Sequence, residues 1–241
     1  MNKQESQMMK GVAILLMLFL HLFNQLHNVE LCRNFIFIND LPLVYILCRA
    51  ANPVAFFLIL GGYGLYKVNE GEDKHRWSRI LKLFIHYWII LIMFVSIGCY
   101  LHPSRYPGSI STIISNFTSF NTSYNGEMWF LFPYIVLSLL APYIFRFMKR
   151  YKTWQIIATT LFIHLCTSFC ISRYGTSHLY HNLWLYNPLL VIHLLFAFSL
   201  GAVAARGNFF EKVKDKFHKL KYINILKLGG GNYFNSDKLY F

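Results

Sequence analysis

The chain has 241 residues, of which 56% are hydrophobic and only 14% are charged, and its formal net charge is +13. A soluble domain carries about one-quarter charged residues, so this composition excludes an ordinary soluble globular protein. Several apolar runs have the length of bilayer spans, which need about 20 residues each. We therefore expect an all-α, polytopic membrane helix bundle.

Six apolar runs are predicted to span the membrane. They cover residues 11–27, 42–66, 83–101, 129–145, 154–171 and 184–205. The second run is long and is interrupted by Asn52-Pro53, because proline disfavours a continuous helix. Beyond residue 227 the membrane pattern stops. We expect one membrane domain over residues 1–227 and a flexible tail over residues 228–241.

Lysine and arginine are distributed unevenly over the connections between these runs. Alternate connections, the terminal segments included, hold 2, 5, 4 and 7 of them, which makes 18, whereas the intervening ones hold only Arg33, Arg105 and Arg173. Because basic connections stay on the cytoplasmic side, both termini are predicted to be cytoplasmic. Anionic membrane lipid as a partner accounts for the net charge. No nucleic-acid partner is expected, since the basic residues are split among separate connections without a nucleic-acid-binding motif.

The first predicted span carries a cation and an imidazole on the same face. Ten residues without a polar side chain separate Lys10 from His21, which corresponds to about three helical turns and roughly 16 Å. Lys10 would lie at the membrane surface and His21 near the middle of the bilayer, where ionisable groups are costly and usually functional. Two interpretations stay open: a functional pair, or a positive anchor with a histidine that is hydrogen-bonded at a helix contact.

The second predicted span ends in a segment with two adjacent small residues, Gly61-Gly62-Tyr63. Small side chains permit close approach of the backbone to another helix or to a ligand. Helix packing is the commoner cause, and a ligand pocket is the alternative.

The cytoplasmic loop that follows is rich in basic residues. Arg76, Arg79 and Lys82 recur at three-residue intervals, which places them along one face of a helix that enters the membrane. The planar guanidinium of arginine binds phosphate oxygens in bidentate fashion. This row could therefore hold a polyphosphate, such as the nucleotide end of coenzyme A. The alternative is a signal for cytoplasmic orientation.

A third pattern lies where an outer loop meets the fourth predicted span. Glu127 precedes the segment Trp129-Phe130-Leu131. Glu127 either orients a catalytic histidine or remains a solvated loop carboxylate, and Trp129 suits the aromatic belt of a membrane protein. His164 and His193 lie within spans without metal-ligand spacing, so core hydrogen bonding is the favoured interpretation and no metal site is expected.

Together these segments resemble the acyltransferase 3 family, the integral membrane O-acyltransferases that modify bacterial surface glycans. That family opens with a basic residue, ten residues and a histidine, as at Lys10 and His21. Its Phe-Phe-x-x-Ser-Gly-Phe/Tyr motif is similar to Phe56-Phe57 and Gly61-Gly62-Tyr63, with Gly61 where serine is usual and with a one-residue offset. An arginine-rich loop and a Trp-Phe-Leu motif follow in the same order, over about residues 8–145.

The resemblance implies a function and a location. An acyl group, expected to be acetyl, would pass from cytoplasmic acyl-CoA to a hydroxyl group of a surface or secreted saccharide. The protein would lie in the bacterial inner membrane and would use acyl-CoA as a co-substrate, without a separate cofactor or metal. His21 would be the catalytic residue, as general base or as nucleophile.

The resemblance also assigns two groups of supporting residues. Those expected to bind the acyl-CoA phosphates are Lys10, Arg76, Arg79 and Lys82. Those expected to line or support the pocket are Gly61, Gly62, Tyr63, Glu127 and Trp129.

Two alternatives to a catalytic function remain. Family members usually have more spans than the six found here, so a truncated, non-catalytic member is one alternative. The other is a transporter in which His21 and Arg49 line a path for a polar solute. The sequence shows no symmetric pair of broken helices, which transporters often carry, so acyl transfer is the favoured prediction.

Overall fold

The computed structural model describes residues 2–69 and 75–217, and nearly all of its regular structure is helical. The predicted tail, residues 228–241, lies outside the described residues. The elements are, in chain order, α1 (Lys3–Phe23), α2 (Leu26–Glu30), β1 (Phe37–Ile38), β2 (Leu41–Pro42), α3 (Leu43–Ala50), α4 (Pro53–Asn69), α5 (Arg76–Leu101), α6 (Ile110–Phe117), η1 (Gly126–Met128), α7 (Leu131–Met148), α8 (Thr153–Tyr174), η2 (Gly175–Leu179) and α9 (Leu183–Arg206).

Six segments are long and apolar enough to cross a membrane, and they follow the predicted runs in number and order. They are Gln4–Phe23, Leu43–Val68, Arg76–Leu101, Gly126–Met148, Thr153–Tyr174 and Leu183–Arg206. The second breaks between α3 and α4, as the Asn52-Pro53 pair predicts. Asn52 caps α4, because its side-chain oxygen accepts a hydrogen bond from the Ala55 amide at 3.0 Å. The prediction of an all-α polytopic bundle is confirmed.

The first span starts and ends earlier than its apolar pattern predicts. Asn2 and Glu5 form a reciprocal capping box, with both hydrogen bonds at 2.8 Å, and this cap begins α1 at Lys3. The helix ends at Phe23, because the backbone leaves the helical conformation at Gln25. Lys10 therefore lies about two turns inside α1. His21 lies in the last turn, closer to the helix end than the sequence suggested.

The core of the bundle forms where α9 packs against α4, α7 and α8. The backbones of α4 and α9 are in direct contact, because a Cβ atom at Gly62 would overlap the Phe198 carbonyl oxygen and one at Gly201 would overlap that of Ile59. Phe198 is fully buried and stacks on Phe145 of α7, with ring centroids 5.9 Å apart. Small residues therefore set the distance between the two central helices.

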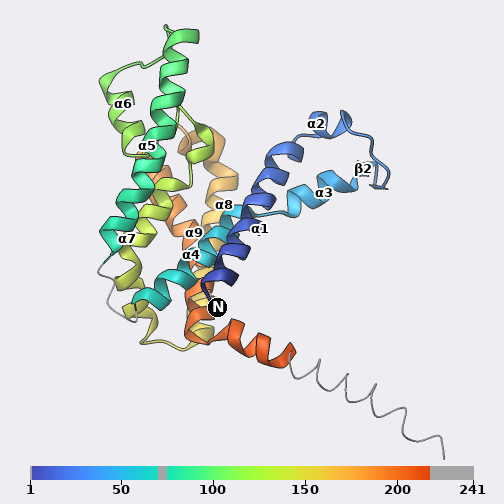
Figure 1. The fold of residues 1–241 in the computed structure, drawn as a ribbon, viewed down its shortest axis with the longest axis vertical. Helices are drawn as coiled ribbons and strands as arrows, with labels where there is room; N and C mark the ends of the chain where they lie inside the picture. The colour runs from blue at the N-terminus through green and yellow to red at the C-terminus, as the bar shows by residue number, and fades with distance from the viewer. Residues whose placement is uncertain (1, 70–74, 218–241) are drawn as a thin grey trace, which may run out of the picture.

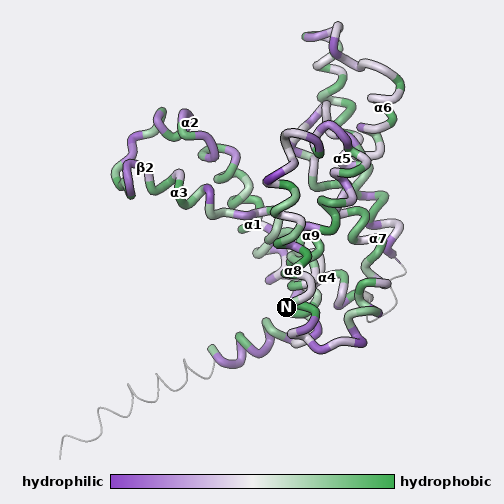
Figure 2. Tube along the Cα trace, turned by 180° about the vertical axis from the view of Figure 1, so that it is seen from behind, coloured by the Kyte–Doolittle hydropathy of each residue, from purple (hydrophilic) through white to green (hydrophobic). Residues whose placement is uncertain are grey.

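The segment from α1 to α3 forms an arm beside this bundle (Figure 1). Its tip contains the antiparallel β1–β2 hairpin, and its base is anchored by contacts of α1 with α4. Hydrophilic residues gather at the tip of the arm and at the ends of the bundle, whereas the helices between are mostly apolar (Figure 2).

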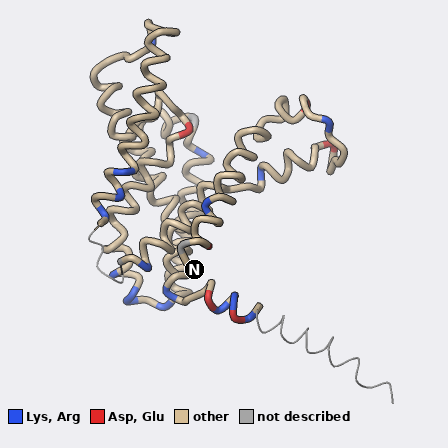
Figure 3. Tube along the Cα trace, viewed as in Figure 1, with Lys and Arg blue, Asp and Glu red and all other residues tan. Residues whose placement is uncertain are grey.

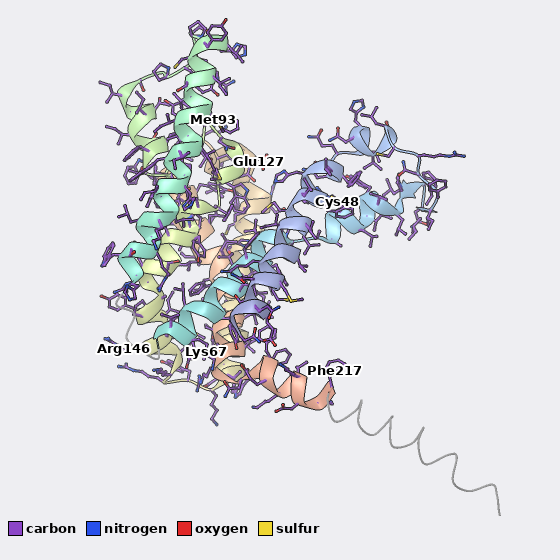
Figure 4. All side chains as sticks on the ribbon, in the orientation of Figure 1. Cys48, Lys67, Met93, Glu127, Arg146 and Phe217 are labelled. Carbon is purple, nitrogen blue, oxygen red and sulfur yellow. The ribbon has the colours of Figure 1, made fainter. Side chains whose placement is uncertain are left out.

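Most described lysine and arginine residues lie toward one end of the bundle (Figure 3). Lys67 and Arg146 mark this end in Figure 4. Arg206 closes the α7–α8 turn there, since its Nη1 donates to the carbonyl oxygens of Met148 at 2.9 Å and Tyr151 at 3.0 Å. This is the end that the charge asymmetry predicts to face the cytoplasm, and we call it the basic end.

The connection between α5 and α7 folds back onto α5 at the opposite end. Tyr87 Oη donates to the Asn116 carbonyl oxygen at 2.6 Å, and Trp88 stacks on Phe117 with centroids 4.4 Å apart. The buried Asn116 side chain accepts a hydrogen bond from the Tyr124 amide at 3.1 Å. These contacts hold the chain just before η1 and so determine where Glu127 lies.

Candidate active site

His21 and Glu127, which are more than one hundred residues apart in the sequence, meet at the centre of the candidate site. His21 Nε2 lies 3.3 Å from Glu127 Oε2. α1 supplies the histidine from its last turn, and η1 supplies the carboxylate. Asn125 caps η1 by accepting a hydrogen bond from the Glu127 amide at 3.3 Å. The His21 side chain is 40% exposed and that of Glu127 is 68% exposed, so the pair is open to a substrate.

A cavity of about 500 Å³ extends from this region toward the basic end. Lys10 of α1 and Arg79 of α5 lie in its wall, together with Gly61 and Gly64 of α4. Most of its other lining residues are apolar. We call it the inner cavity; it combines two cations with an apolar interior.

Arg76 and Arg79 share a second, smaller recess of about 150 Å³ beside the inner cavity. Arg76 Nη1 donates to the Leu139 carbonyl oxygen at 3.5 Å. Its Nε is buried and has no hydrogen-bond partner among the described residues. An unpaired buried donor is costly, and this N–H group is a hydrogen-bond donor that no described residue uses.

Lys82 is exposed and lines neither of these spaces. A three-residue step turns a helix by about 300°, so two steps place Lys82 about 120° away from Arg76. The structure therefore brings together Lys10, Arg76 and Arg79, whereas Lys82 points elsewhere.

Another cavity, of about 620 Å³, lies beyond the His21–Glu127 pair. Its lining includes Leu20 of α1, Asn52 at the start of α4, Trp129, and Tyr180 in the connection between α8 and α9. The connection between α8 and α9 lies at the end of the bundle opposite the basic residues (Figures 1 and 3). We call this space the outer cavity.

The His21–Glu127 pair lies beside both cavities. Leu20, the neighbour of His21, lines the outer cavity, and so does Trp129. Met128 and Phe130 line the inner cavity. The segment that follows Glu127 thus separates a basic cavity from an outer one, and its residues alternate between the two.

The chain matches a family model described as an acyltransferase domain over residues 4–228, which is nearly its whole length. The chain belongs to the acyltransferase 3 family. The comparisons with curated proteins and with solved structures give no match. With six apolar helices and this domain, the protein is a membrane acyltransferase, as the four sequence motifs predict.

In this acyltransferase, the three residues of the Gly-Gly-Tyr motif face three different neighbours. Gly61 borders the inner cavity and the ring of Tyr134. Gly62 packs against α9. Tyr63 is buried, and its hydroxyl donates to Glu211 Oε1 at 3.3 Å. Of the three, only Gly61 lines the cavity, so packing accounts for the other two positions.

Two histidines that the sequence assigned to core hydrogen bonding also line the outer cavity of this acyltransferase. His164 and His193 stack with ring centroids 4.2 Å apart. They come from neighbouring antiparallel spans and lie at similar distances from the connections, 11 residues after the start of α8 and 13 before the end of α9. This similar position along two consecutive spans is the signal in the sequence that would have paired them.

Proposed function

We propose that this membrane acyltransferase transfers an acetyl group from cytoplasmic acetyl-CoA to a hydroxyl group of a saccharide on the far side of the bacterial inner membrane. The observation that carries the proposal is the His21–Glu127 contact at 3.3 Å beside two cavities, of which the inner one contains basic residues. A reaction that joins a cytoplasmic donor to an external acceptor requires such an arrangement.

The donor would bind at the inner cavity. Lys10 and Arg79 in its wall offer charge-assisted hydrogen bonds to the coenzyme A phosphates. Arg76, whose Nε has no described partner, adds a donor beside them. The apolar lining farther in accommodates the acyl-pantetheine arm, whose thioester would reach His21. Lys82 is exposed and is left without a role in this arrangement.

His21 would act as the general base. With Nε2–H donating to Glu127, the Nδ1 atom is free to accept a proton from the saccharide hydroxyl. The hydroxyl oxygen attacks the thioester carbonyl carbon, a C–O bond forms and the C–S bond breaks. The departing thiolate takes the proton from the imidazolium, so the products are an O-acetyl ester and free coenzyme A. The Glu127 carboxylate stabilises the imidazolium between these steps.

The direct test is acetyl transfer by the purified protein in sealed vesicles. Radiolabelled acetyl-CoA is supplied on the basic side and a mixture of cell-surface saccharides on the other side. We expect label in the saccharide fraction and an equal amount of free coenzyme A. Flux of a polar solute without consumption of acetyl-CoA would instead support a transporter and would reject the proposal.

Arg79→Ala is expected to weaken donor binding. Loss of a hydrogen bond to a charged phosphate costs about 1.5–3 kcal/mol, so the KM for acetyl-CoA should rise by about ten- to a hundredfold, with a smaller change in kcat. Initial rates against acetyl-CoA concentration measure this effect. Arg105→Ala, in the connection at the opposite end, is the matched control. An unchanged KM in Arg79→Ala would remove Arg79 from the donor site.

Glu127→Gln is expected to lower kcat by about ten- to a hundredfold, because the amide no longer stabilises the imidazolium of His21. The KM for acetyl-CoA should stay the same, since Glu127 is absent from the inner cavity wall. Glu30→Gln, an exposed carboxylate at the end of α2, is the control. Equal kcat values for both variants would show that Glu127 is only a solvated loop residue.

A further inference from the structure

The outer cavity has a mixed lining: about half of its residues are aliphatic and the others are polar or aromatic. Trp129, Tyr180 and Tyr186 are its aromatic members, and Asn52 and Ser172 are among its polar ones. None of the described residues in its wall is Asp, Glu, Lys or Arg. A charged ligand would therefore lose its hydration there without gaining an ionic partner, which is costly. A neutral ligand would bind without this penalty.

His164 and His193 supply the most specific polar groups of this wall. His164 Nδ1 lies 2.9 Å from the His193 carbonyl oxygen, and because a carbonyl only accepts, Nδ1 carries the hydrogen. Its Nε2 is then an acceptor, and it has no hydrogen-bond partner among the described residues.

The same tautomer follows for His193 from its neighbours on α8. Its Nδ1 lies 3.2 Å from Thr167 Oγ1 and 3.4 Å from Ser168 Oγ. Thr167 donates its single hydroxyl hydrogen to a backbone carbonyl oxygen, either that of Ile163 at 2.9 Å or that of His164 at 3.0 Å. The Ser168 hydroxyl donates to the His164 carbonyl oxygen at 2.7 Å. Both hydroxyls can then only accept from the imidazole. The Nε2 atom of His193 is thus a second acceptor without a partner in the described part of the chain.

Two imidazole nitrogens that can accept hydrogen bonds suit a ligand that presents several O–H donors. The aromatic rings nearby suit the same ligand, because flat apolar faces pack against the C–H faces of a sugar ring while tyrosine hydroxyls hydrogen-bond at the edge. A cavity of about 620 Å³ is also within the range of about 300–1,000 Å³ that is usual for ligand sites.

We infer that the outer cavity binds the acceptor, that this acceptor is an uncharged saccharide, and that the Nε2 atoms of His164 and His193 accept hydrogen bonds from its hydroxyl groups. This inference rests on the proposed function, which requires an acceptor on this side of His21. It adds two specificity-determining residues and excludes uronic acids and phosphorylated sugars as preferred acceptors.

The test is equilibrium binding to the full-length protein in lipid nanodiscs, which does not depend on catalysis. The probes are tritiated neutral trisaccharides built from glucose, mannose or N-acetylglucosamine, and trigalacturonic acid is the charged comparison. We expect saturable binding of at least one neutral probe and at least about tenfold weaker binding of trigalacturonic acid, as expected for a buried unpaired charge. Failure of every neutral probe to bind, or equally tight binding of trigalacturonic acid, would overturn the inference.

Variants of His193 separate the role of Nε2 from that of Nδ1. His193→Asn keeps a donor near the Nδ1 position but lacks the outer acceptor, and its Kd for the neutral probe should rise by about three- to tenfold, the value of one hydrogen bond. His193→Gln places an amide oxygen near the Nε2 position and should restore much of the affinity. If His193 acts only through its contacts with Thr167 and Ser168, His193→Asn should bind the neutral probe more tightly than His193→Gln. That result would reject the assignment.

The matched control is His86→Asn. His86 is an exposed histidine of α5 whose Nδ1 lies 2.6 Å from the Lys82 carbonyl oxygen, and it lines neither cavity. Its substitution should leave the Kd of the neutral probe unchanged. Acetyl-transfer rates on the same samples distinguish the two proposals. Binding of the neutral saccharide without acetyl transfer would reject the proposed function but not the acceptor site. Acetyl transfer with an unchanged KM for the acceptor in His193→Asn would reject the acceptor site but not the proposed function.

Discussion

His21→Ala is expected to lower the rate of acetyl transfer by at least about a hundredfold, which is the usual contribution of a general base. The substitution removes the only imidazole that the structure describes in contact with Glu127, while α1 keeps its cap and its contacts with α4. Label transferred from radioactive acetyl-CoA in reconstituted vesicles measures the loss. Binding of acetyl-CoA should stay near the wild-type level, because His21 lies outside the wall of the inner cavity.

His27→Ala is the matched control for this prediction. His27 is an exposed histidine of α2, a few residues beyond His21, and its loss should leave the transfer rate unchanged. Comparable expression and protease accessibility of the two variants exclude a defect in membrane insertion. Full transfer by His21→Ala would show that the histidine of the first span has no catalytic role.

Gly201→Leu is expected to prevent assembly of the bundle. A Cβ atom at Gly201 would overlap the Ile59 carbonyl oxygen and crowd the Tyr63 amide nitrogen. These are backbone atoms, which cannot move aside as a flexible side chain does. Forcing a larger residue into a packed core commonly costs about 1–3 kcal/mol, and separating two central helices should cost more. Size-exclusion chromatography and thermal unfolding in detergent should show little or no folded protein.

Gly11→Leu is the corresponding control, because no atom lies within 4 Å of a Cβ atom placed there. Gly11 also lies inside a membrane-spanning helix, but it is exposed whereas Gly201 is buried. The two variants therefore add the same side chain to a spanning helix and differ in whether another helix faces it. Only Gly201→Leu should lose the folded peak. Equal melting temperatures for the two variants would show that α4 and α9 do not depend on this contact.

Local patterns in the sequence were sufficient for the membrane architecture. Apolar runs of bilayer length predicted six spans, and Asn52-Pro53 predicted the break between α3 and α4, because span length and proline geometry are properties of short segments. The ends of α1 were less predictable. The capping box of Asn2 and Glu5 extends the helix through polar residues that an apolar run does not include, so His21 lies in the last turn.

The candidate site was only partly predictable. The one-dimensional motifs indicated Lys10, His21 and Arg79 as a group, and the structure places Lys10 and Arg79 in one cavity wall. Three-residue spacing did not show that Lys82 turns away, because each such step rotates a helix short of a full turn. The Gly-Gly-Tyr motif likewise combined one cavity residue with two packing residues.

Sequence alone determined the family, the spans and the residue types needed for acyl transfer, since these depend on composition and order along the chain. Only the tertiary structure decided which residues meet. The structure brings His21 into contact with Glu127, places residues 128–130 alternately in the two cavities, and stacks His164 on His193. These features join segments that are far apart in the sequence. Such contacts depend on how α1, α4, α8 and α9 pack. The close approach of α4 and α9 requires Gly62 and Gly201, whose effect appears only when the facing helix is in place.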